Sequence, residues 1–199
     1  MKPMRTIWLR MRRLAFELRG NNSGVAAVEF AMIIPIMAAL LIGTNEFSAG
    51  VAIDRKVTLM ARTLSDLTSQ NISVTDEKLT NFFNASKGIM TPYAWAPVRG
   101  TITELYIHPT TLKARVQWSK GTAPHNKGDI VEIPEALKIA GTYLIFSEVK
   151  YNYVPSVAWF INKVDGIQLS DVSFTRPRQG LCVAYPAPAP GAAIECPKE

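Results

Sequence analysis

The longest apolar segment of the chain lies near its beginning. From Val25 to Ile42, 18 residues contain a single charged side chain, Glu29. As a helix these residues would extend about 27 Å, close to the ~30 Å hydrocarbon core of a bilayer. We therefore predict a transmembrane helix over residues 25–42. Pro35 removes a backbone hydrogen bond from this helix, and the resulting kink is either neutral or has a functional role in bending.

The helical pattern continues beyond the apolar segment. Apolar residues recur at spacings of four, three, four and three, which is typical of one buried helix face: Ile53, Val57, Met60, Leu64 and Leu67. We predict an amphipathic extension over residues 43–70 that packs across a sheet. Gly43 and Gly50 lower the helix propensity between the two parts, so a bend there is expected.

A second, shorter helix is expected after a break at Gln70–Ser73. Ser73 or Thr75 can cap its first turn, and the helix should extend to about Ala85. Its inner face is formed by Leu79, Phe82 and Phe83.

From Val98 onward the pattern changes to the alternation typical of strands. The clearest predicted strand has one apolar face, formed by Leu112, Ala114, Val116 and Trp118. Residues 101–107 are its expected hairpin partner. A third strand has a face formed by Tyr143, Ile145, Val149, Tyr151 and Tyr153. In the fourth predicted strand, the alternating apolar residues move from one face to the other near Ser170–Asp171, which we interpret as a β-bulge.

These elements predict an α+β fold with an antiparallel sheet laid on a long helix. The expected divisions are a basic leader (1–24), a transmembrane helix (25–42), its amphipathic extension (43–70) and an α+β domain (71–199). Residues 121–134 are interpreted as a surface loop. A short helix or turn is expected at Val157–Ile161, where Trp159 and Phe160 form either part of the core or a binding patch.

The positive charge of the chain is concentrated before the apolar segment. Six of the 22 Lys and Arg residues, and only one of the 16 acidic residues, precede Val25, which leaves 16 basic against 15 acidic residues afterwards. The remainder has no basic excess of the kind that nucleic-acid binding requires, so we expect no nucleic-acid partner. The basic leader should stay in the cytoplasm, with the C-terminal domain outside it in the periplasm.

The two cysteines fit an oxidising compartment. Cys182 and Cys196 flank a proline-rich segment that allows the chain to turn back on itself, so we expect a disulfide between them. The alternative is two unpaired thiols in a frayed tail.

The basic leader and the apolar segment could also be a signal sequence. An ordinary secretory signal has an apolar region of about 7–15 residues before its cleavage site, and this one is longer. We therefore expect the cut before the segment, between Gly24 and Val25. Gly24-Val25-Ala26-Ala27-Val28-Glu29-Phe30, between a basic leader and Ala31–Pro35, resembles a type IV prepilin processing site. More narrowly, it resembles the TadE/TadG-like pseudopilins of tight-adherence (Flp-type) pilus systems. The similarity is specific over residues 20–70, with a weaker likeness at Val149–Pro155.

This resemblance implies a minor pilin that is inserted in the bacterial inner membrane and cleaved after Gly24 by a prepilin peptidase. Val25 would become the new N-terminus, and Glu29 would be the fifth residue of the mature chain, followed by the aromatic Phe30. The implied partners are the peptidase, other minor pilins, the major pilin, the inner-membrane assembly platform and the lipid bilayer. Glu29 can pair with the Val25 amine of its own chain or, in an assembly, with that of a neighbouring subunit. Alternatively, it is simply protonated or lies at the membrane interface.

Catalytic and metal-binding motifs are not evident. His108 and His125 each stand beside a proline in a predicted loop, without a second ligand at a metal-like spacing. We expect no cofactor, no metal and no enzymatic activity: the chain is a substrate of a peptidase. The alternative function is an uncleaved single-pass signal anchor whose periplasmic domain binds a partner.

Overall fold

The computed structural model describes residues 24–156 and 166–198. The leader Met1–Ser23 and the predicted turn at Val157–Ile161, with Trp159 and Phe160, lie outside the described residues. The described elements follow in this order: α2 (Val25–Ser69), α3 (Asp76–Lys87), η2 (Gly88–Met90), β1 (Val98–Ile107), β2 (Ala114–Gly121), β3 (Ile130–Val131), η3 (Glu135–Leu137), β4 (Tyr143–Tyr153) and β5 (Ile167–Thr175). This order of elements confirms the predicted α+β class.

The chain forms two compact units, residues 1–47 and 48–199. In the first unit, α2 begins at Val25 and continues without interruption through Pro35. It is long and apolar enough to cross a bilayer, and no residue in its most apolar 18-residue window is buried. The prediction that the helix continues past Ile42 is confirmed, because α2 extends to Ser69.

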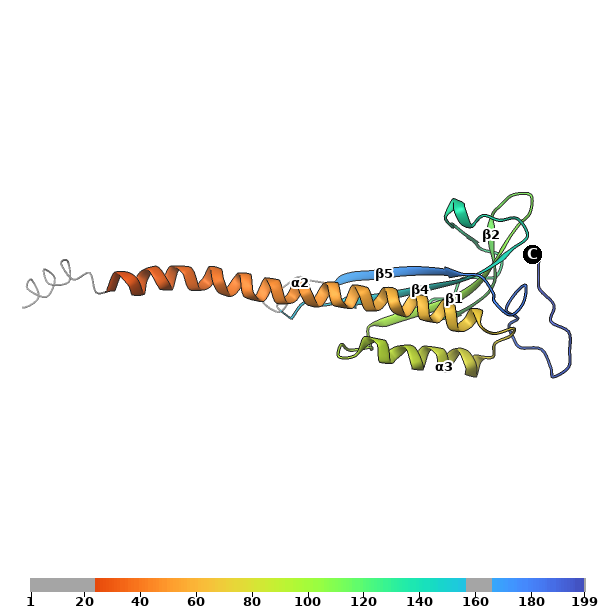
Figure 1. The fold of residues 1–199 in the computed structure, drawn as a ribbon, viewed down its shortest axis with the longest axis horizontal. Coiled ribbons are helices and arrows are strands. Elements are labelled where there is room, and N and C mark those ends of the chain that lie inside the picture. Colours follow the sequence, from red (N-terminus) through yellow and green to blue (C-terminus); the bar gives the residue numbers. More distant parts are fainter. Residues whose placement is uncertain (1–23, 157–165, 199) are drawn as a thin grey trace, which may run out of the picture. The chain divides into compact units, whose positions relative to one another are not determined.

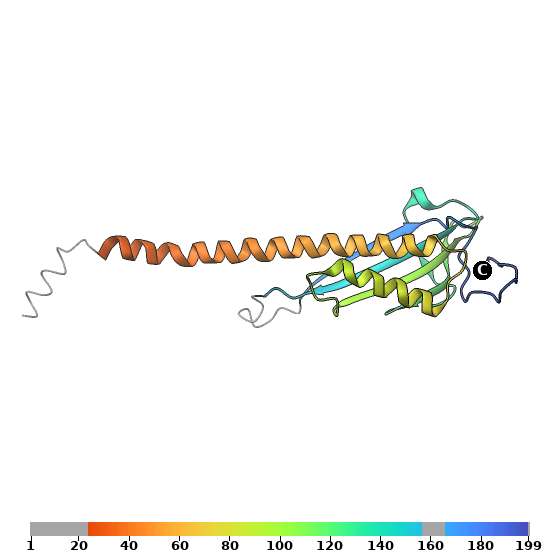
Figure 2. The same ribbon diagram turned by 60° about the horizontal axis from the view of Figure 1, so that its bottom comes forward.

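The second unit contains an antiparallel sheet in the order β3-β2-β1-β4-β5. The part of α2 in this unit and α3 lie side by side against one face of the sheet (Figures 1 and 2). Thr75 is the cap of α3: its hydroxyl accepts a hydrogen bond from the Lys78 N–H. Asp76 and Glu77 follow in the first turn, where the helix dipole favours negative charge.

The main core lies between these helices and the sheet. The predicted stripe of α2 is confirmed, since Ile53, Val57, Met60 and Leu64 are buried, while Leu67 is half-buried. On the sheet, its partners include Ile102, Ile145, Val149 and Tyr151. A Cβ on Gly100 would lie 2.9 Å from a ring carbon of Phe83, so a larger residue there would require the Phe83 ring of α3 to shift.

A second core covers the opposite face of the sheet. It is formed by Leu105, Ile107, Ala114, Val116, Ile133, Leu144 and Phe146, with Phe174 packed against it. The rings of Phe146 and Phe174 stack with their centroids 5.0 Å apart. Most of β1 is therefore buried on both faces.

This second core corrects the predicted single apolar face of β2. The register between β1 and β2 shifts at Glu104 and Leu105, where Glu104 pairs with Trp118 and Leu105 with Val116. Gln117 is thus the extra residue of a β-bulge, and the bulge places Val116 and Trp118 in different cores. Leu112 precedes the strand in a left-handed conformation (φ 54°) and is exposed.

Two further predictions were wrong. β5 pairs with β4 residue by residue from Ile167 to Thr175, without the expected bulge at Ser170–Asp171. The apolar residues change parity because Leu169 packs in the main core and Phe174 in the second, on opposite faces. The expected loop over residues 121–134 contains the short edge strand β3, which pairs with Ala114 and Arg115 of β2.

The expected disulfide joins Cys182 and Cys196, whose Cα atoms are 5.7 Å apart. It closes the tail against the sheet, and Val183 between its ends is fully buried. Replacing both cysteines with serine should lower the free energy of unfolding by about 3 kcal/mol, the chain-entropy value for a loop of about 15 residues. A urea titration of the full chain in a mild detergent, followed by near-UV circular dichroism, measures this. An unchanged midpoint and slope would show that the bond contributes nothing to stability.

Candidate functional site

The predicted cleavage site lies at the first residue of a helix. α2 begins at Val25, and Gly24 immediately precedes it. A Cβ built on Gly24 would meet no heavy atom within 4 Å, and Gly24 is not among the glycines with positive φ. Within the described part of the chain, neither packing nor backbone conformation therefore requires glycine at this position.

Glu29 and Phe30 lie one turn further into the helix, and both are exposed. The spacing from Val25 to Glu29 is i to i+4, so the two residues share a helix face with an axial rise of about 6 Å. Among residues 24–156 and 166–198, no hydrogen bond or ion pair joins the Glu29 carboxylate to another group. The carboxylate is thus available to a group from outside this part of the chain.

An apolar groove continues from Phe30 along the same helix. Its walls are formed by Phe30, Ile34, Met37, Ala38, Leu40, Leu41 and Thr44. The Thr44 hydroxyl donates a hydrogen bond to the Leu40 carbonyl at 2.8 Å, which satisfies the one polar side chain in the groove. The face is therefore suited to lipid or to another apolar helix.

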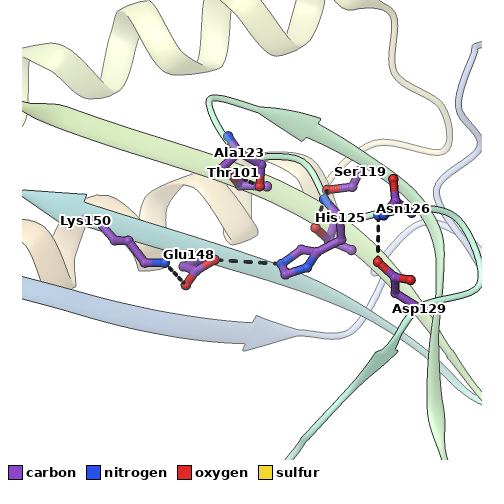
Figure 3. Close-up of polar contacts among 9 residues, drawn as sticks. Thr101, Ser119, Ala123, His125, Asn126, Asp129, Glu148 and Lys150 are labelled. Atoms are coloured by element: carbon purple, nitrogen blue, oxygen red, sulfur yellow. Dashed lines mark hydrogen bonds and ion pairs between the residues drawn. The ribbon is translucent and has the colours of Figure 1, made fainter.

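A polar cluster lies on the face of the sheet opposite to the helices (Figure 3). The Glu148 carboxylate on β4 accepts from Lys150 at 2.8 Å and lies 3.7 Å from His125 Nε2. The loop that carries His125 is also tied to the sheet, because the His125 N–H donates to the Ser119 hydroxyl at 3.1 Å. The Ser119 hydrogen bond, with those between Thr101 and Ala123, ties the loop between β2 and β3 to the sheet. The sequence could not reveal the His125–Glu148 contact, because 23 positions separate the two residues.

Among the described residues, neither histidine belongs to a group of side chains that could bind a metal ion. Nδ1 of His108 accepts from the backbone N–H groups of Thr110 and Thr111 at 3.3 and 3.4 Å, which makes it a turn-stabilising residue. In the residues that the structure describes, no group of three or more His, Cys, Asp or Glu side chains could hold a metal ion.

Sequence reasoning missed one buried acid, Glu104 on β1, which is fully inaccessible to solvent. Its burial raises the pKa of the carboxyl to about 8. A signal for it existed: Glu104 has the same strand parity as Ile102 and Tyr106, both of them apolar residues of a predicted strand.

In the described part of the chain, these features combine one candidate membrane-spanning helix with an α+β domain. Residues 24–63 match the family model described as TadE-like protein, which confirms the resemblance seen in the sequence. The matched residues include Gly24, Val25, Glu29 and Phe30. Searches of curated proteins and of solved structures gave no match. The TadE-like match indicates a minor pilin-like role associated with Tad pili.

Proposed function

We propose that this chain is a minor pilin, or pseudopilin, of a Tad (Flp-type) pilus. It is inserted in the inner membrane with its basic leader in the cytoplasm and residues 71–199 in the periplasm. A prepilin peptidase cuts between Gly24 and Val25, and the mature chain takes part in initiating or assembling the pilus. In this role the chain is a substrate and building block, and it has no catalytic activity of its own.

One observation carries the proposal: among the described residues no packing contact requires glycine at position 24, yet Gly24 directly precedes the helix. A small residue is needed there if the backbone must enter the narrow active site of a peptidase. The TadE-like match begins at this same glycine, which supports the same interpretation.

After cleavage, the Val25 amine provides a positively charged partner for the Glu29 carboxylate, which has none among the described residues. In the mature chain the amine is a positive charge at the membrane face, one turn before Glu29. When subunits pack with an axial offset, Glu29 reaches the amine of its neighbour, and burial in the assembly strengthens the attraction. Phe30 then packs, with the groove that begins at it, against the apolar helix of an adjacent minor or major pilin.

The mass of the chain extracted from membranes tests the processing step. A mature chain that starts at Val25 supports the proposal. An intact start at Met1 or Lys2, in cells that make working pili, would leave the alternative of an uncleaved anchor with a partner-binding periplasmic domain.

Replacing Glu29 with glutamine tests the assembly step. The variant should be cleaved normally, but its incorporation into sheared pili or minor-pilin complexes should fall at least about tenfold, because an unpaired terminal amine remains buried. Quantitative immunoblotting of the sheared fraction measures this. Asp54→Asn, an exposed acid on the same helix, is the matched control and should assemble as the unaltered chain does. Normal assembly of the Glu29 variant would disprove the charge pairing.

A further inference from the structure

A cavity of about 520 Å³ lies between the sheet and the C-terminal tail, which covers the end of the sheet (Figure 1). Trp118 of β2 and Tyr185 of the tail form part of its wall, with their ring centroids 5.4 Å apart. Glu104 lines it from β1, and Cys196 of the disulfide lines it from the tail. The cavity is far larger than the ~30 Å³ that one water molecule occupies in the liquid.

Glu104 has only one of its two oxygens engaged. Oε1 accepts a hydrogen bond from the Val183 N–H at 2.5 Å, whereas Oε2 is buried without a hydrogen-bond partner. Buried polar atoms in native proteins nearly always have a partner, and leaving one without costs about 1–3 kcal/mol. Protonation does not remove the problem, because it converts an unpaired acceptor into an unpaired O–H donor. The position therefore requires a complementary group.

The polar atoms of the aromatic residues are already in use. Trp118 Nε1 donates to the Val183 carbonyl at 2.8 Å, and the Tyr185 hydroxyl donates to Asp76 at 2.8 Å. The faces of aromatic rings attract cations, and the Tyr185 ring already holds one. Lys120 already lies 5.0 Å from the centroid of the Tyr185 ring.

We propose that this cavity binds a primary ammonium group, with Glu104 Oε2 as the acceptor and the ring of Trp118 as its cation-attracting wall. A guanidinium group fits less well, because it prefers two carboxylate oxygens and Oε1 is occupied by Val183. The group can come from a free alkylamine or from a lysine side chain of a polypeptide. Since Glu104 is closed to solvent, the tail around Tyr185 and Pro186 must move outward to admit it. The proposal is independent of the pilus role.

Charged groups around the cavity determine how binding depends on pH. Lys127 and Glu195 line it, and Lys120 and Asp76 lie beyond Tyr185. Tyr143 and Tyr106 face Glu104 from the neighbouring strand positions.

The pKa of Tyr143 is raised to about 12 by burial and that of Lys120 is also raised, so neither changes charge between pH 6 and pH 9. The pKa of Asp76 is lowered by its hydrogen bond from Tyr185, so it stays ionised. Glu104 ionises within this range, and ammonium binding should therefore strengthen as the pH rises.

The test uses the full chain in detergent micelles, with ¹⁵N in the indole groups of its four tryptophans. Trp118→Phe assigns the resonance of Trp118. Titration with n-butylammonium at pH 9 should shift this resonance saturably and leave the others in place. The uncharged isostere 1-butanol should bind at least about tenfold more weakly. Glu104→Gln should weaken n-butylammonium binding at least about tenfold, whereas Glu77→Gln, on an exposed part of α3, should not.

A second measurement covers the case in which Glu104→Gln fails to fold, which loss of the other indole resonances would reveal. The unaltered chain should then bind n-butylammonium at least about tenfold more tightly at pH 9 than at pH 6. Absence of a saturable shift, equal binding of 1-butanol, or undiminished binding to a folded Glu104→Gln variant would overturn the proposal. A blocked Ala-Lys-Ala peptide, compared with its norleucine analogue, identifies the source: tighter binding than n-butylammonium supports a polypeptide lysine, and weaker binding a free amine.

Discussion

Replacing Gly24 with phenylalanine is expected to stop processing while leaving the chain in the membrane. A bulky side chain at the cut prevents the backbone from entering the peptidase, so the rate of cleavage should fall at least about a hundredfold, equivalent to roughly 3 kcal/mol of lost transition-state binding. The apolar segment Val25–Ile42 is unchanged, so insertion should persist. Intact-mass measurement of the carbonate-resistant membrane fraction distinguishes the precursor, which retains Met1–Gly24, from the mature chain.

Gly43→Phe provides the matched control for this variant. Gly43 lies in the same helix, and a Cβ there also meets nothing within 4 Å. This control should be cleaved normally, because its added side chain is distant from the cut. Cleavage of the Gly24 variant would contradict the assigned processing site. Loss of cleavage in both variants would show instead that any bulky substitution in the helix disturbs processing.

The second large effect concerns the pH dependence of stability. The pKa of Glu104 is raised from 4.5 to about 8, mainly by desolvation on burial. The folded chain therefore holds a proton that the unfolded chain releases between these values. This contribution to stability is complete below about pH 4.5 and is lost as the pH rises through 8. At 1.36 kcal/mol per unit, the loss approaches roughly 5 kcal/mol.

Urea titrations of the full chain in detergent at pH 5, 6, 7 and 8 should show this decline. In Glu104→Gln, the part of the decline that Glu104 causes should disappear, because glutamine does not titrate. Glu77→Gln should retain the slope of the unaltered chain. A Glu104→Gln variant with the same pH dependence as the unaltered chain would show that Glu104 is not the titrating group.

Local patterns in the sequence were sufficient for the helices. The burial of Ile53, Val57, Met60 and Leu64 follows directly from their spacing, because a helix face is set by residues close in sequence. Thr75 was one of two candidate caps, and the structure selects it. All strands of the described sheet except β3 were found for the same reason, by alternation.

The assignment of strand faces could not be derived from the sequence. The predictions for β2 and β5 assumed one apolar face, whereas this sheet is covered on both sides. Alternation therefore led us to predict a bulge in β5, where the register is in fact continuous. It gave no indication of the bulge that β2 has at Gln117. Which core a strand residue joins depends on partners far along the chain, and periodicity contains no information about them.

The two candidate sites differ in how far apart in the sequence their residues lie. The predicted processing motif is local, so the sequence alone suggests it, and cleavage there stays a prediction. The Glu104 cavity depends on Val183, which is 79 positions away, and on a tail held by the disulfide. For the first site, the structure adds that no described residue packs against a Cβ at Gly24, and the second proposal depends on the structure entirely.

Coverage of both sides of the sheet limits where a neighbouring subunit can attach. The broad surfaces of β1 and β4 are occupied by this chain's own side chains. Among the described residues, no strand pairs with the free edge of β5, where Ile167 and Val172 are exposed. Adjacent proteins would therefore meet this domain along its margin and its loops, and substitutions there could alter association while leaving the interior intact.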